Sequence, residues 1–77
     1  MASRLTLHYD RVGDILYIET CPPYAEQDSD HLDDDVVARF NPETGQIESL
    51  EILFFSTLLD ENGVYELPVT AELYPVK

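Results

Sequence analysis

The stretch that decides the fold reads Tyr9-Asp10-Arg11-Val12-Gly13-Asp14-Ile15-Leu16-Tyr17-Ile18. Its centre combines Asp10 and Asp14, whose side chains bond nearby backbone N–H groups, with Gly13, which tolerates a positive φ. Aromatic, β-branched and aliphatic residues lie on both sides of this turn. We therefore predict a β-hairpin whose strands are residues 5–9 and 15–19.

A second hairpin is predicted by the segment Phe40-Asn41-Pro42-Glu43-Thr44-Gly45-Gln46-Ile47. Asn41 begins the turn, Pro42 takes its second position, and Gly45 stands where a left-handed residue is needed. The flanking strands are residues 36–40 and 46–53. Together the two hairpins predict a small, mainly β or α+β domain with an antiparallel sheet of about four strands.

The predicted strands differ in whether one face or both faces must be buried. The first alternates, so that Leu5, Leu7 and Tyr9 share one half-buried face. The second, residues 15–19, is apolar on both faces and is expected in the centre of the sheet or under a partner. In the last, Leu50 and Ile52 share a face unless a bulge near Ser49 changes the alternation.

Two segments are expected outside the hairpins. The prolines of Cys21-Pro22-Pro23 end the second strand, and residues 24–35 are expected to form an exposed acidic loop. Residues 54–59 fit either a short helix or a continued strand, and we favour a helix that ends at Asn62-Gly63. Residues 64–77 carry Pro68 and Pro75, which confine them to an edge strand or an extended arm. We expect one domain over residues 1–77, with residues 64–77 as its C-terminal arm.

Charge and size exclude several classes of function. The chain has 77 residues and a formal net charge of −12, so it is expected to repel nucleic acid and anionic membranes. No secretory signal and no apolar stretch of membrane-spanning length is evident, which favours a cytoplasmic protein. Cys21 is the only cysteine, so no disulfide can form within the chain. Because so small a core needs support, oligomerisation is expected.

A metal site is a weaker interpretation of the acidic segment than a solvated loop. Its carboxylates could bind a hard cation such as Ca²⁺, but the spacing does not fit an EF-hand, because Leu32 and Arg39 fall at ligand positions. We expect no cofactor. The weak candidate ligands, beside His31, are Asp28, Asp30, Asp33, Asp34 and Asp35.

Catalytic chemistry has little support in the sequence. Glu51 lies in a strongly apolar strand, and Arg39 on the preceding strand is its expected ion-pair partner. His8 near Asp10 is weak evidence for acid–base work. Neither the hydroxyls of residues 56 and 57 nor the Cys21 thiol has a recognisable base beside it.

The order of motifs resembles a known family. The matching residues are Tyr9-Asp10, Asp14, Leu16-Tyr17-Ile18, Val36-Val37, Gly45, Ile47, Leu50-Glu51-Ile52-Leu53 and Ser56. This pattern is similar to that of short bacterial proteins grouped as domain-of-unknown-function family 2283, over roughly residues 5–59. The chain departs from the family at Ser49-Leu50 and in its longer acidic segment. The resemblance implies a compact β-rich fold and no established catalytic or binding residue.

These observations favour a non-enzymatic protein-interaction module that forms a homodimer. The apolar segment before the tail exceeds what so small a core can bury, and it is the expected dimer contact. Its residues are Leu53, Phe54, Phe55, Leu58 and Leu59. The acidic segment could cover a basic surface of another protein, as an antitoxin-like or inhibitory partner does. The alternative is a small metal-binding or enzymatic protein that uses the acidic segment or Glu51.

Overall fold

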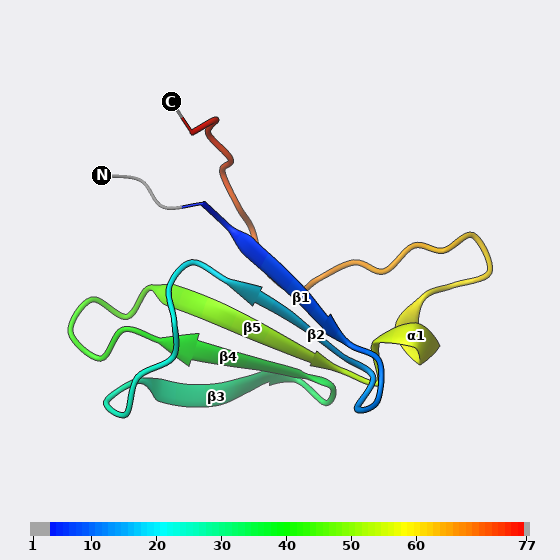
Figure 1. Cartoon of the computed structure of the whole chain (residues 1–77), viewed down its shortest axis with the longest axis horizontal. Coiled ribbons are helices and arrows are strands. Elements are labelled where there is room, and N and C mark those ends of the chain that lie inside the picture. Colours follow the sequence, from blue (N-terminus) through cyan, green and yellow to red (C-terminus); the bar gives the residue numbers. More distant parts are fainter. Residues whose placement is uncertain (1–3, 77) are drawn as a thin grey trace.

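The structure is a computed structural model that describes residues 4–76. Its strands form one antiparallel sheet in the order β1-β2-β5-β4-β3 (Figure 1). The predicted fold class is confirmed: the chain is mainly β, with one short helix. The elements are β1 (Thr6–Asp10), β2 (Ile15–Glu19), β3 (Asp28–Asp33), β4 (Val36–Phe40), β5 (Ile47–Leu53) and α1 (Phe55–Leu58).

The turn between β1 and β2 is closed by its first aspartate. Asp10 Oδ1 accepts hydrogen bonds from the backbone N–H groups of Val12 and Gly13 at 3.0 and 3.1 Å. A Cβ on Gly13 would lie 2.9 Å from Asp10 Oδ2. A side chain at residue 13 would therefore require the Asp10 carboxylate, which closes the turn, to move.

The turn between β4 and β5 is built as the sequence predicts. Asn41 Oδ1 accepts hydrogen bonds from the N–H groups of Glu43 and Thr44 at 2.8 and 3.1 Å. Gly45 adopts a φ of +74° and donates its N–H to Asn41 O at 2.8 Å. Side-chain and backbone bonds thus converge on the residue that begins the turn.

The prediction that residues 24–35 form a loop is wrong for half of that segment. Asp28–Asp33 form β3, which pairs with β4 and supplies the fifth strand of the sheet. An edge strand buries few side chains, so a polar sequence can occupy it when its neighbour needs a hydrogen-bonding partner. Five of the six β3 residues are exposed.

A bulge interrupts the pairing of β4 with β5. Arg39 lies opposite Ser49 and Phe40 lies opposite Ile47, so Glu48 is the extra residue. This is one position before the bulge considered from the sequence. An extra residue bends its strand and turns the local side chains, so Ser49 is buried although it precedes the buried Leu50.

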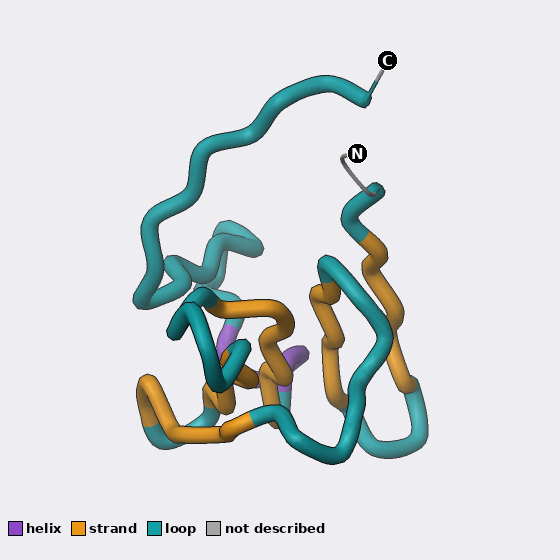
Figure 2. Tube along the Cα trace, turned by 90° about the vertical axis from the view of Figure 1, so that its left-hand side faces the viewer, coloured by secondary structure: helices purple, strands orange, loops and turns teal. Residues whose placement is uncertain are grey.

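The core lies on one face of the sheet. Val36 and Ala38 of β4 and Leu50 and Ile52 of β5 are buried there. We call this the covered face, because α1 and the C-terminal arm, residues 64–76, lie over it (Figure 2). The other side is the open face. The half-buried residues that pack on the core are Leu16, Ile18, Leu32, Phe40, Phe55, Leu58, Tyr65, Leu67 and Val69.

The helix is shorter than the sequence suggests. α1 is a single turn, and Phe54 before it takes a left-handed φ of 53°. The predicted end at Asn62-Gly63 is wrong, because Gly63 belongs to a separate turn in which its N–H bonds Asp60 O at 2.9 Å. Gly63 does take a positive φ of 77°, but it closes that turn rather than the helix.

The C-terminal arm is extended but forms no strand in residues 64–76. It runs from α1 back across the sheet toward the start of β1 (Figure 1). Its outer part stays open to solvent, with Leu73 and Tyr74 82% and 78% exposed. The expectation that β1 is half-buried is also wrong, because the arm crosses β2 and β5 and leaves Leu7 62% exposed.

Candidate functional site

One candidate cluster joins the first hairpin to α1. Asp14, at a left-handed φ of 56°, accepts the Tyr9 hydroxyl at 2.7 Å on Oδ1. The same oxygen accepts the Ser56 N–H at 3.0 Å, while Oδ2 accepts the Ser56 hydroxyl at 2.6 Å. The Asp14 carbonyl also accepts the N–H of Phe55 at 3.0 Å. Asp14 therefore satisfies donors at the start of the helix, as a capping residue does.

This cluster is suited to structure rather than to catalysis. Hydrogen bonds from Ser56 and then from Tyr9 hold the pKa of Asp14 below its usual value. Donation to Asp14 raises the pKa of Tyr9. A carboxylate of lowered pKa is a poor base, and Ser56 has a carboxylate rather than an imidazole beside it. The cluster thus anchors α1 and does not activate a nucleophile.

A second cluster surrounds Glu48 at the bulge. Glu48 Oε1 accepts the Tyr24 hydroxyl at 2.5 Å and the Gln27 amide at 3.1 Å, and Oε2 accepts the Asn41 amide at 3.4 Å. The Glu48 carbonyl accepts both the N–H and the hydroxyl of Thr20, at 2.8 and 2.9 Å. One glutamate therefore fastens the connection after β2 to β5.

Hydrogen bonds stabilise the negative charge of the Glu48 carboxylate. Donation by Tyr24, followed by that of Gln27, lowers the pKa of Glu48. The bond to Glu48 raises the pKa of Tyr24 to about 12. Cys21 is half-buried and free beside this segment. The carboxylate is occupied by three side-chain donors, which leaves it little capacity for acid–base work.

The open face carries the ion pair that the sequence indicated. Arg39 Nη2 lies 3.0 Å from Glu51 Oε2, and Arg39 Nε donates to the same oxygen at 3.1 Å. Within residues 4–76 this is the one ion pair. The charge of Glu51 is thus neutralised by Arg39, which lies two residues along β4 from Val37, the residue directly opposite Glu51. This diagonal cross-strand arrangement is typical of a structural ion pair.

Glu51 also belongs to a cross-strand row on the open face. Residues directly opposite one another share a face, and the pairing places Tyr17 beside Glu51 and His8 beside Tyr17. The rings of His8 and Tyr17 lie 5.8 Å apart. The row reads His8, Tyr17, Glu51, Val37 and His31. The two histidines stand at its opposite ends, so they cannot act together.

The acidic residues do not converge. The Asp28, Asp30 and Asp33 carboxylates extend from exposed positions along β3, opposite Phe40, Ala38 and Val36 of β4. Asp34 and Asp35 lie in the turn that follows. In the described part of the chain, no three His, Cys, Asp or Glu side chains are placed to hold a metal ion.

The predicted dimer contact is divided between the core and the surface. Phe55 and Leu58 pack against the core from α1, and Leu53 is half-buried at the end of β5. Phe54 and Leu59 point outward, with 57% and 37% of their surfaces exposed. Only part of the segment is therefore available to a partner.

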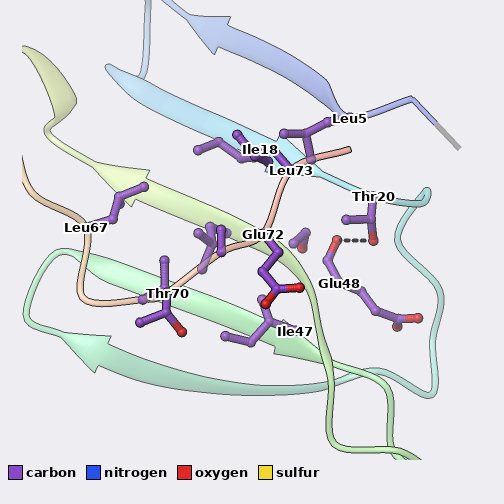
Figure 3. Close-up of a pocket in the computed structure, with 13 residues that line it drawn as sticks. Leu5, Ile18, Thr20, Ile47, Glu48, Leu67, Thr70, Glu72 and Leu73 are labelled. Atoms are coloured by element: carbon purple, nitrogen blue, oxygen red, sulfur yellow. Dashed lines mark hydrogen bonds between the residues drawn. The ribbon is translucent and has the colours of Figure 1, made fainter. Parts of the chain in front are cut away.

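A groove of about 330 Å³ lies between the covered face and the arm (Figure 3). Its walls are mainly apolar, and Leu5 and Leu73 are among the residues that line it. Glu48 and Thr20 also line the groove. Their hydrogen bond joins the Thr20 hydroxyl to the Glu48 carbonyl, so these two residues do not present a convergent set of polar groups there. Such a groove favours apolar contact over chemistry.

Sequence reasoning missed the Tyr24–Glu48 and Asp14–Ser56 contacts. These pairs are separated by 24 and 42 residues, and no local spacing relates them. The donors to Glu48 could not be identified before the bulge was known.

No helix among residues 4–76 is long and apolar enough to cross a membrane.

Comparison with known proteins adds one assignment. The chain has no match among curated proteins or solved structures. The family model described as "Protein of unknown function (DUF2283)" matches residues 6–56, from β1 to the serine that Asp14 binds. Since this match covers more than half of the sequence, the chain belongs to the DUF2283 family.

Proposed function

We propose that this chain is a non-enzymatic protein-interaction module that works as a homodimer. The observation that carries the proposal is the imbalance between its core and its surface. Only four apolar residues of the described chain are buried, whereas Leu7, Leu73 and Tyr74 are 62%, 82% and 78% exposed. Exposed apolar surface of this kind is typical of an interaction site, and Leu73 also lines the groove.

The alternative enzymatic function has less support. Within residues 4–76, no serine, threonine or cysteine side chain bonds a histidine. Glu51 is held by Arg39, and Asp14 and Glu48 are each occupied by several donors. Each candidate acid therefore already has a structural task.

Light scattering over a range of protein concentrations tests the homodimer. We expect a mass of two chains at micromolar concentration, falling toward one chain on dilution. Because the chain carries a net charge of −12, added salt should strengthen the association by screening repulsion. A single-chain mass at every concentration, unchanged by salt, would reject the homodimer.

A basic partner protein is a second proposal, which rests on the acidic edge. Asp28, Asp30 and Asp33 are exposed on β3, whereas Arg39 is occupied on the open face. Such an edge complements a basic surface and would accelerate the encounter with it. An antitoxin-like or inhibitory protein would use its charge in this way.

Affinity capture at low salt, followed by a high-salt wash, tests the second proposal. A single basic protein released by salt supports it, and recovery of the chain alone contradicts it. With the partner in hand, association rates of the D33N/D34N/D35N variant should be lower than those of wild type. The matched control is E43Q/E61Q/E66Q, which removes the same charge from exposed positions elsewhere. Equal rates for the two variants would assign the effect to net charge rather than to this edge.

A further inference from the structure

The two edges of the sheet differ in charge. β1 and β3 are the outer strands, so each leaves one row of backbone N–H and C=O groups without a strand beside it. Three of the six residues of β3 are aspartates, and a second copy brought to that edge meets the same charge. Residues 6–9 of β1 contain no acid. Repulsion between copies is therefore weakest at β1.

The pairing pattern shows which β1 residues direct their backbone groups outward. At the two ends of β2, the carbonyl of Asp14, which precedes the strand, and the N–H of Thr20, which follows it, both bond the β5 side of the sheet. Backbone groups alternate in direction along an antiparallel strand, so residues 15, 17 and 19 bond toward β1. Their partners, residues 10, 8 and 6, bond back toward β2. The outward groups on β1 therefore belong to Leu5, Leu7 and Tyr9.

The same three residues carry exposed apolar side chains. Leu7 and Tyr9 lie opposite Ile18 and Leu16, which places them on the covered face. Leu5, Leu7 and Tyr9 are 47%, 62% and 41% exposed. Leu5 also lines the groove, together with Leu73 of the arm (Figure 3). Free backbone groups and an apolar strip thus coincide along one edge.

We infer that two copies of this chain join by antiparallel pairing of β1 with the partner's β1, with Leu7 opposite the partner's Leu7. This inference rests on the proposed homodimer and specifies its interface. Leu5 then lies opposite the partner's Tyr9, so the apolar strip is matched on the covered face. Arg4 lies opposite the partner's Asp10, and the two-fold symmetry forms this charge pair twice.

Complementarity favours this register over its neighbour. The outward backbone groups allow only shifts of two residues. A shift that places His8 opposite the partner's His8 moves Arg4 opposite the partner's Val12 and forfeits both charge pairs. The pairing centred on Leu7 aligns apolar residues and opposite charges together. A chain of high negative charge should associate where a positive residue faces a negative one.

Substitution of Leu7 tests the location of the interface. In L7D, two like charges would face each other across the two-fold axis, which destabilises a cross-strand pair. We expect the dimer dissociation constant to rise by about tenfold or more, measured by analytical ultracentrifugation. The matched control is V12D, which adds the same charge at a residue that is 99% exposed in the adjoining turn. A dimer that L7D weakens no more than V12D does overturns the inference.

Disulfide trapping tests the register, in a C21S background that contains no other thiol. Opposite Cα atoms of a hydrogen-bonded antiparallel pair lie about 5.5 Å apart, within disulfide range. L7C should form a covalent dimer on mild oxidation, while H8C and D30C should not. Circular dichroism confirms that each variant folds. Trapping of H8C in place of L7C rejects the register, and trapping of D30C in place of L7C rejects the edge.

Measurements on the wild-type protein distinguish failure of the proposed homodimer from failure of the β1 interface alone. If light scattering finds a single chain at all concentrations, the proposed homodimer fails and this interface fails with it. If the wild type is dimeric but L7C gives no covalent dimer, the homodimer stands and only the β1 interface is rejected.

Discussion

Asp14 binds Ser56 across 42 residues of sequence, through its Oδ2 to the serine hydroxyl at 2.6 Å and its Oδ1 to the serine N–H at 3.0 Å. The contact joins the first turn of the chain to the only helix among the described residues. It also fixes the position of α1, which follows β5 and is joined to the arm by the turn at residues 60–63. The stability of the covered face should therefore respond to the charge of Asp14.

The loss of stability in acid should depend on the charge of Asp14. Since the Ser56 hydrogen bonds lower the pKa of Asp14 in the folded protein, its contribution to stability is present above the unfolded value of about 3.9. That contribution is lost as the pH falls through the lower folded value. The D14N variant keeps a residue that tolerates positive φ but lacks the titrating charge. Urea midpoints should fall less between about pH 5 and pH 2 in D14N than in wild type. Parallel curves for the two proteins would contradict this assignment.

Alkali should act on Tyr24. Its folded pKa of about 12 exceeds the ordinary value of about 10, so the bond to Glu48 contributes stability that is complete below the unfolded value. This stability is lost as the pH rises through the folded value. We expect wild type to lose stability over that interval, and Y24F to lack this part of the loss. Absorbance of tyrosinate, compared between wild type and Y24F, should assign the latest ionisation to Tyr24. A spectrum in which Y24F removes an early ionisation would disagree.

The core should tolerate truncation poorly. Ile52 is 1% exposed and one of the two largest fully buried side chains of the described chain. I52A should lower the free energy of unfolding by about 2–5 kcal/mol, which is the usual cost of an apolar cavity. The control V12A alters a residue that is 99% exposed and should stay within about 0.5 kcal/mol of wild type. Chemical denaturation of both variants measures the difference, and equal losses would place the core elsewhere.

The second turn depends on backbone conformation alone. No atom lies within 4 Å of the position that a Cβ on Gly45 would take, so a small side chain meets no obstacle there. The φ of +74° nevertheless disfavours it. G45A should cost about 1–2 kcal/mol, and G45N less, because asparagine tolerates the left-handed region. Thermal or urea unfolding of the two variants tests the order, which steric crowding would reverse.

Local chemistry explains which parts of this fold were predictable. The turns at Asp10 and Asn41 follow from side chains that bond backbone two or three residues away, so their sequence contains the whole interaction. β3 could not be predicted in this way. Its polar residues have little strand preference of their own, and they pair because β4 needs a neighbour. α1 ends early because Leu59 is extended and Asp60 begins a separate turn that Gly63 closes.

The candidate clusters likewise differ in whether local sequence could predict them. Arg39 and Glu51 lie on neighbouring strands of one hairpin, so their proximity follows from the turn between them. The Glu48 cluster depends on the bulge, which turns that side chain toward Tyr24 in a connection far away in sequence. A shift of one residue in the strand pairing decides which face of the sheet a side chain occupies. Amino-acid composition does not indicate such a shift.

The acidic edge has a consequence for the size of any assembly. Antiparallel strands can in principle add without limit, as they do in amyloid fibrils, provided that each new copy presents another receptive edge. A copy bound through β1 would present only β3, where three aspartates repel a further chain. Polymerisation would therefore terminate after one addition, and the charge of β3 would keep the assembly finite.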